Sequence, residues 1–120
     1  MFQNLFVQQH FKKIEMKNID QEQWQKSIAK DENAIILDVR TPKEWAEGII
    51  ENALLINVLD TEEFDAEIKK LDKNKNYYVY CRSGKRSSQA CELLENINVN
   101  ETYNLSGGIL DWTGKTVSPK

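Results

Sequence analysis

One segment of the chain places a nucleophile beside a cluster of positive charge: Cys81-Arg82-Ser83-Gly84-Lys85-Arg86-Ser87. Three of the chain's 16 basic residues fall in this stretch, although the protein as a whole is acidic. Cations and a helix N-terminus lower the pKa of a thiol from about 8.5 to roughly 3.5–7.5. We therefore expect a thiolate at Cys81 near neutral pH, at the base of a pocket that binds anions.

The elements on either side of this segment explain how such a pocket would form. Residues 77–81 are aromatic and β-branched, which predicts a strand, and a helix is expected from about residue 87 to 96. Gly84 lets the loop between them curl, because glycine adopts positive φ freely. Ligands of open α/β sheets bind beyond the carboxyl ends of the strands. Backbone N–H groups of the loop and of the helix start would converge on an anion there.

The rest of the chain alternates between strand-like and helical patterns. Short apolar runs predict further strands at residues 34–37 and 53–58. Residues 102–105 are expected to form a last strand. This alternation predicts one doubly wound α/β domain with a mostly parallel sheet and helices on both faces.

Helix starts are marked by capping residues. Asp20 and Asp60 are expected to cap two helices, and Thr41 to Glu44 combine a capping box with proline at the first helical position. A helical turn is expected at residues 109–112. We divide the chain into an N-terminal leader (1–16), the domain (17–114) and a C-terminal tail (115–120).

The composition excludes several classes of function. Sixteen basic and 19 acidic residues among 120 give a formal net charge of −3, and binding a phosphate backbone requires a basic face. Two cysteines and one histidine are too few for a four-ligand structural zinc site made of Cys and His alone. No apolar run approaches the ~20 residues of a membrane span, and the leader lacks the order of a secretory signal. We expect a cytoplasmic monomer with reduced thiols and with no nucleic-acid or membrane partner.

The segment from Cys81 to Ser87 resembles the active-site loop of rhodanese-type sulfurtransferases. Residues 38–45 (DVRTPKEW) are similar to that family's first signature, and residues 104–108 (NLSGG) with Trp112 are similar to its C-terminal one. The resemblance covers about residues 19–112 and implies a rhodanese-like fold with a five-stranded sheet. Many relatives have a histidine, isoleucine and proline after the first helix, where this chain has residues 48–53 (GIIENA).

The resemblance implies a two-step sulfur transfer that needs no metal and no organic cofactor. Cys81 attacks the outer sulfur of a small anionic donor such as thiosulfate, and sulfite leaves. A thiol, cyanide or protein acceptor then takes the sulfur from the Cys81 persulfide. Such covalent catalysis predicts ping-pong kinetics.

The resemblance also assigns roles around Cys81. Arg82 and Lys85 would attract the donor, whereas Arg86 would either do the same or tie the loop to Asp38 or another carboxylate. Asp38 and Arg40 are expected to support the loop as an ion pair or cap at the end of a strand. The residues expected to bind substrate are Arg82, Ser83, Gly84, Lys85, Arg86 and Ser87.

Two other functions stay open. A persulfide carrier or regulatory docking module would keep the same cysteine and turn over thiosulfate poorly. A phosphatase or arsenate-reductase-like enzyme is opposed by the loop length, because such phosphatases place arginine six residues after the cysteine and this chain has Ser87 there. The second cysteine, Cys91, is expected to be a packed core thiol.

Overall fold

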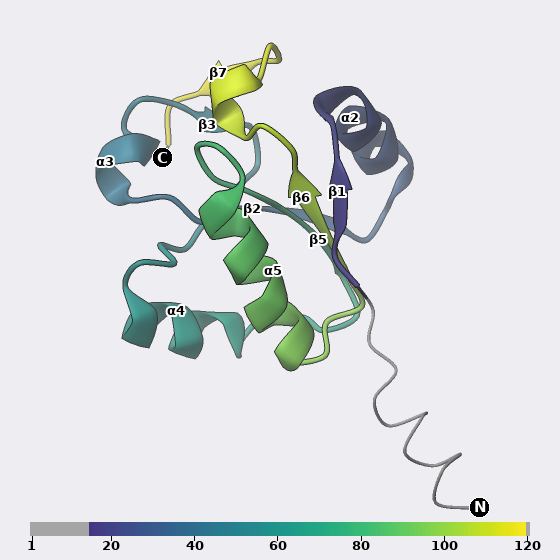
Figure 1. The fold of residues 1–120 in the computed structure, drawn as a ribbon, viewed down its shortest axis with the longest axis vertical. Coiled ribbons are helices and arrows are strands. Elements are labelled where there is room, and N and C mark those ends of the chain that lie inside the picture. The colour runs from purple at the N-terminus through teal and green to yellow at the C-terminus, as the bar shows by residue number, and fades with distance from the viewer. Residues whose placement is uncertain (1–14, 120) are drawn as a thin grey trace, which may run out of the picture.

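The computed structural model describes residues 15–119 (Figure 1). Its centre is a five-stranded sheet in the order β1-β6-β5-β2-β4, in which every neighbouring pair of strands is parallel. The expected α/β fold with a parallel sheet is confirmed. In sheet order the strands are β1 (Lys17–Ile19), β6 (Glu101–Leu105), β5 (Asn76–Tyr80), β2 (Ala34–Asp38) and β4 (Leu54–Leu55).

Helices cover both faces of this sheet. Figure 1 shows α2 (Gln21–Lys30) on one side and α4 (Thr61–Ile68) and α5 (Lys85–Asn96) on the other. Strand β5 contributes side chains to the cores on both faces of the sheet, because successive side chains of a strand point to opposite faces. Tyr78 and Tyr80 pack in one cluster with Trp24 of α2, and the other cluster joins their neighbours in β5 to residues of α4 and α5.

The helices begin where their capping residues predict. The Asp20 carboxylate accepts from the Gln23 N–H at 2.9 Å, and Thr41 and Glu44 form the expected capping box at the start of α3 (Pro42–Trp45). Helix α5 begins at Lys85, two residues earlier than the sequence predicts. Its N-cap is Gly84, with φ of +107°, so the loop after β5 is very short.

The expected strand at residues 53–58 is shorter than predicted. Only Leu54–Leu55 forms a strand, although the chain stays beside the end of β2, where the Ile56 N–H donates to the Asp38 carbonyl oxygen at 3.0 Å. The Val58 N–H also donates to the Val39 carbonyl oxygen at 3.1 Å, before the chain reaches α4.

Three short elements complete the fold: two short strands and one 3-10 helix. Strand β3 (Ile49–Ile50) pairs antiparallel with β7 (Thr116–Val117), which lies in the segment expected as a C-terminal tail. The expected helical turn is the 3-10 helix η1 (Ile109–Asp111). Residues 1–14 of the predicted leader lie outside the described residues. Between residues 15 and 119, no helix has both the length and the apolar character needed to cross a membrane.

Candidate active site

Cys81 directly follows β5 and lies at the carboxyl edge of the sheet, where the sequence places the reactive group. It is only 1% exposed. Three potential donors lie within hydrogen-bond distance of its Sγ: the Gly84 N–H at 3.1 Å, the Ser87 N–H at 3.4 Å and the Ser87 hydroxyl at 3.3 Å. The loop and the first turn of α5 therefore converge on the sulfur as donors.

These donors determine the ionisation of the thiol. Burial raises the pKa of Cys81, but the Ser87 hydroxyl and the backbone N–H groups of Ser87, Gly84 and Ser83 lower it by more, so the pKa lies below its ordinary value. Hydrogen bonds to a charged acceptor are stronger than those between neutral groups. The lowered pKa expected from the sequence is thus present, and hydrogen bonding is its main cause.

Two of the three positively charged side chains of the loop are available to bind an anion. Arg82 and Lys85 are exposed, and neither has an ion pair to a carboxylate of the described residues. Ser83 is exposed beside them. Their position suits the predicted attraction of an anionic donor.

Arg86 ties the loop to a carboxylate, which is the second of the two roles considered for it. Its guanidinium donates to both carboxylate oxygens of Glu44, at 2.8 and 2.9 Å. The hydrogen bonds from Arg86 hold the pKa of Glu44 at about 2, against the opposing effect of burial. The partner is thus Glu44 and not Asp38. The sequence does not predict this contact, because the capping box already accounts for Glu44.

Asp38 and Arg40 form the expected ion pair at the end of β2. Asp38 is fully buried and Arg40 is 3% exposed, with 2.8 Å between Arg40 Nη2 and Asp38 Oδ2. Arg40 also donates to the Gly48 carbonyl oxygen at 2.8 Å, and the Trp45 indole donates to Asp38 at 3.2 Å. The pair therefore joins β2 to both ends of the segment that contains α3, which in turn carries the partner of Arg86.

The C-terminal signature supports the start of the active-site loop. The Ile109 and Leu110 N–H groups donate to the carbonyl oxygens of Cys81 and Arg82, each at 3.0 Å. Gly108 has φ of +61°, and a Cβ atom there would lie 2.3 Å from the Arg82 carbonyl oxygen. Only glycine permits this close approach.

Asn104 is a site residue that was not predicted from the sequence. This residue of β6 is 4% exposed, and its Oδ1 accepts from the Ser87 hydroxyl at 2.5 Å. The sequence signal was a polar side chain next to the apolar end of a buried strand, followed by the two glycines of the signature. The contact spans 17 positions of sequence, so local patterns did not predict it.

A cleft of about 570 Å³ opens beside the loop. It lies between α3 and η1, and its lining includes the exposed Leu110 and several charged residues: Arg40, Lys43, Glu44, Glu47 and Arg82. A molecule reaching the loop from this side would meet both signs of charge.

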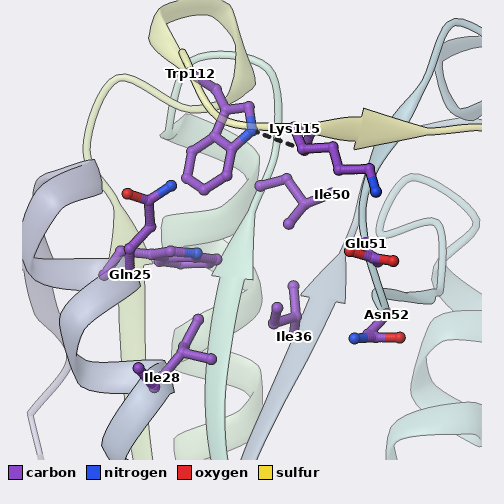
Figure 2. Close-up of a pocket in the computed structure, with 10 residues that line it drawn as sticks. Gln25, Ile28, Ile36, Ile50, Glu51, Asn52, Trp112 and Lys115 are labelled. Carbon is purple, nitrogen blue, oxygen red and sulfur yellow. Dashed lines mark hydrogen bonds between the residues drawn. The ribbon is translucent and has the colours of Figure 1, made fainter.

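A second hollow of about 300 Å³ lies on the face covered by α2 (Figure 2). Its walls are mainly apolar, and Trp112 turns its indole toward the hollow while donating to the Lys115 carbonyl oxygen at 3.2 Å. None of the residues predicted to bind substrate lines it. Within residues 15–119, no group of three His, Cys, Asp or Glu side chains is placed to hold a metal ion.

Comparison with known proteins agrees with this geometry. The family model described as the Rhodanese-like domain matches residues 20–115. The chain belongs to the rhodanese-like family. The match includes both signatures and the Cys81 loop, as the resemblance in the sequence implied.

Individual relatives cover most of the rhodanese-like domain. A putative sulfurtransferase of Bacillus subtilis is 37% identical over 103 residues, which span 86% of this chain and 96% of the relative. A putative sulfur carrier protein of the same organism is 31% identical over 98 residues, spanning 82% of this chain and 51% of the relative. Among solved structures, a rhodanese-like domain protein from Staphylococcus aureus has a TM-score of 0.74 and 31% identity, covering 88% of this chain and all of the other.

Proposed function

We propose that this rhodanese-like protein is a sulfurtransferase that carries sulfur as a persulfide on Cys81. The observation that carries the proposal is the set of three potential hydrogen-bond donors around Cys81 Sγ, together with the lowered pKa of the thiol. The names of its sulfurtransferase relatives in Bacillus subtilis and Allochromatium vinosum, 37% and 35% identical, support the same reaction class.

The first step uses an anionic donor, for which we take thiosulfate. The Cys81 thiolate attacks the outer sulfur, a new S–S bond forms, and the S–S bond of thiosulfate breaks with its electron pair leaving on sulfite. We expect the loop N–H groups that bind Cys81 Sγ to hold the negative outer sulfur of the persulfide as well. The exposed Arg82 and Lys85 raise the local concentration of the anion.

The second step returns the enzyme to its starting state. A nucleophilic acceptor, either a thiolate or cyanide, attacks the outer sulfur of the persulfide. The bond from that sulfur to Cys81 Sγ breaks, and the electron pair returns to Cys81 as a thiolate. The cleft beside Arg82 provides space for the acceptor to approach. Both steps need only the cysteine and hydrogen-bond donors, so no general base is required.

Steady-state kinetics with thiosulfate and cyanide test this proposal. Double-reciprocal plots at several fixed concentrations of one substrate are expected to be parallel, as in a ping-pong mechanism. Cys81→Ser is expected to abolish turnover, whereas the matched variant Cys91→Ser is expected to retain it. Turnover that persists in Cys81→Ser would overturn the proposal.

A persulfide carrier is the second candidate, and the surface beside the loop favours it. Leu110 is 63% exposed, and its N–H donates to the carbonyl oxygen of Arg82. An exposed apolar side chain next to a charged cleft suits contact with a protein acceptor. The 31% identical relative named as a putative sulfur carrier supports this class as well. A persulfide that forms normally but transfers very slowly to small thiols would identify a carrier.

A phosphatase is disfavoured by the ion pair of Arg86. Phosphoryl transfer at a cysteine loop needs an arginine free to grip the phosphate oxygens. Here both donating nitrogens of Arg86 are directed at Glu44.

A further inference from the structure

The side chain of Asn104 joins three parts of the site. Its Oδ1 accepts from the Ser87 hydroxyl at 2.5 Å, and its Nδ2 donates to the Gly84 carbonyl oxygen at 3.2 Å and to Asn18 Oδ1 at 2.8 Å. The Gly84 carbonyl oxygen can only accept a hydrogen bond, so the amide nitrogen of Asn104 must face it. The oxygen of Asn104 therefore faces Ser87, and the Ser87 hydroxyl must be the donor.

The Ser87 hydroxyl has one hydrogen but lies beside two possible acceptors. Its Oγ lies 2.5 Å from Asn104 Oδ1 and 3.3 Å from Cys81 Sγ. A hydroxyl group donates a single hydrogen. While Cys81 is a thiol, the S–H donates to Ser87 and the O–H donates to Asn104, so every group is satisfied. Once Cys81 is a thiolate, Asn104 and the sulfur compete for the same hydrogen.

We propose that Asn104 is a positioning residue that withholds the Ser87 hydrogen from Cys81 and so keeps the sulfur a stronger nucleophile than the loop alone would make it. The proposal rests on the proposed sulfur transfer for its purpose. The nucleophilicity of a thiolate falls as its pKa falls, and the best attacking thiol has a pKa near ambient pH. If the Cys81 thiolate accepted every hydrogen bond available in this loop, a larger fraction of Cys81 would be ionised at neutral pH. That thiolate would, however, be a weaker nucleophile.

The direction in which the pKa of Cys81 changes when Asn104 is replaced distinguishes this role from a purely structural one. If Asn104 only braced the loop through Gly84, its removal would disorder the donors and the pKa of Cys81 would rise. If Asn104 competes for the Ser87 hydrogen, its removal releases that hydrogen to the thiolate and the pKa falls. Only Asn104→Asp adds a charge, and the variants below leave in place the charged and titratable groups already present around Cys81: Asp38, Arg40, Arg82, Lys85, Arg86 and Cys91.

The test is the pKa of Cys81, measured from the pH dependence of its alkylation by iodoacetamide, with no sulfur donor present. Asn104→Leu, which has nearly the same shape, is expected to lower this pKa by about 0.5–1 unit. In a Ser87→Ala background the same substitution is expected to leave the pKa unchanged. Asn18→Ala is the matched control, because it removes the other partner of the same amide and is expected to have no effect.

A second variant keeps the test decisive if Asn104→Leu does not fold. Asn104→Asp retains the acceptor for Ser87 and strengthens it with a negative charge, so the pKa of Cys81 is expected to rise by more than it does in the Ser87→Ala background. A rise of the pKa in folded Asn104→Leu, or an effect of either substitution that is the same in both backgrounds, would overturn the inference. Because alkylation needs no sulfur donor, failure of sulfur transfer itself would be seen separately.

Discussion

The guanidinium of Arg86 holds both carboxylate oxygens of Glu44, at 2.8 and 2.9 Å, across 42 positions of sequence. The contact connects the first turn of α5, which contributes the donors to Cys81, with α3, whose N-terminus Glu44 also caps. Both side chains are 22% exposed, so water screens the pair only partly. Glu44 therefore connects the first signature of the chain to the loop that follows Cys81.

Glu44→Gln is expected to destabilise the protein at neutral pH by up to about 3 kcal/mol, because the pKa of Glu44 is lowered from 4.5 to about 2 and each unit corresponds to about 1.4 kcal/mol. A carboxyl group with a depressed folded-state pKa contributes stability above its unfolded pKa and loses it as pH falls through the folded value. The advantage of the native protein over Glu44→Gln should therefore be full above about pH 5 and vanish near pH 2. Denaturant unfolding of both proteins across this range measures it. A difference that does not change with pH would contradict the ion-pair explanation.

Arg82→Ala and Lys85→Ala are each expected to raise KM for thiosulfate about 2–5-fold, with a smaller change in kcat, because each removes one exposed charge from the approach of the anion. The increase should shrink at high ionic strength, where exposed charges are screened. Lys73→Ala removes an equally exposed charge in the loop before β5, at the opposite edge of the sheet, and serves as the control. An equal rise of KM in the control would show that net charge alone attracts the donor.

Gly108→Ala is expected to destabilise the protein by at least about 1–3 kcal/mol, because its φ of +61° and ψ of −163° lie in a region that only glycine enters readily. The added methyl group would also displace the carbonyl oxygen of Arg82, so alkylation of Cys81 should slow as its donors move. Thermal unfolding and the alkylation rate are the measurements. Ser106→Ala, at an exposed position nearby, is the control, and native-like values for Gly108→Ala would show that the loop does not need this contact.

The two cysteines are expected to differ sharply in reactivity. Cys91 is fully buried, and burial raises its pKa to about 12, whereas the pKa of Cys81 is lowered. Iodoacetamide at neutral pH should therefore add one group to the native protein and two in denaturant. Peptide mapping after alkylation identifies the site. Modification of Cys91 in the native protein would mean that the core around α5 opens more readily than its packing indicates.

Much of the fold is predictable from local patterns. The apolar run at residues 34–37 and the aromatic run that ends in Cys81 match β2 and β5 closely, because strands buried on both faces need continuous apolar sequence. Strands β1 and β7 were not predicted, because each is two or three residues long and has no pattern of its own. Their pairing depends on partners that are far away in the sequence.

The site likewise has a part that local sequence predicts and a part that it does not. The loop from Cys81 to Ser87 and the pair of Asp38 and Arg40 are local in sequence, so residue types and spacing identified them. The contacts of Glu44 with Arg86 and of Asn104 with Ser87 are formed by tertiary packing. Each of those two residues already had a local interpretation, as a helix cap and as part of a strand-end signature, which concealed its second contact.

The mass of the intact protein after incubation with thiosulfate shows whether Cys81 carries the transferred sulfur. The native protein is expected to gain one sulfur atom and to release one sulfite per chain, and a thiol or cyanide should restore the original mass. Cys81→Ser is expected to gain nothing, and Cys91→Ser to behave as the native protein does. A native protein that gains no sulfur, or a Cys81→Ser variant that gains it, would contradict sulfur transfer through Cys81.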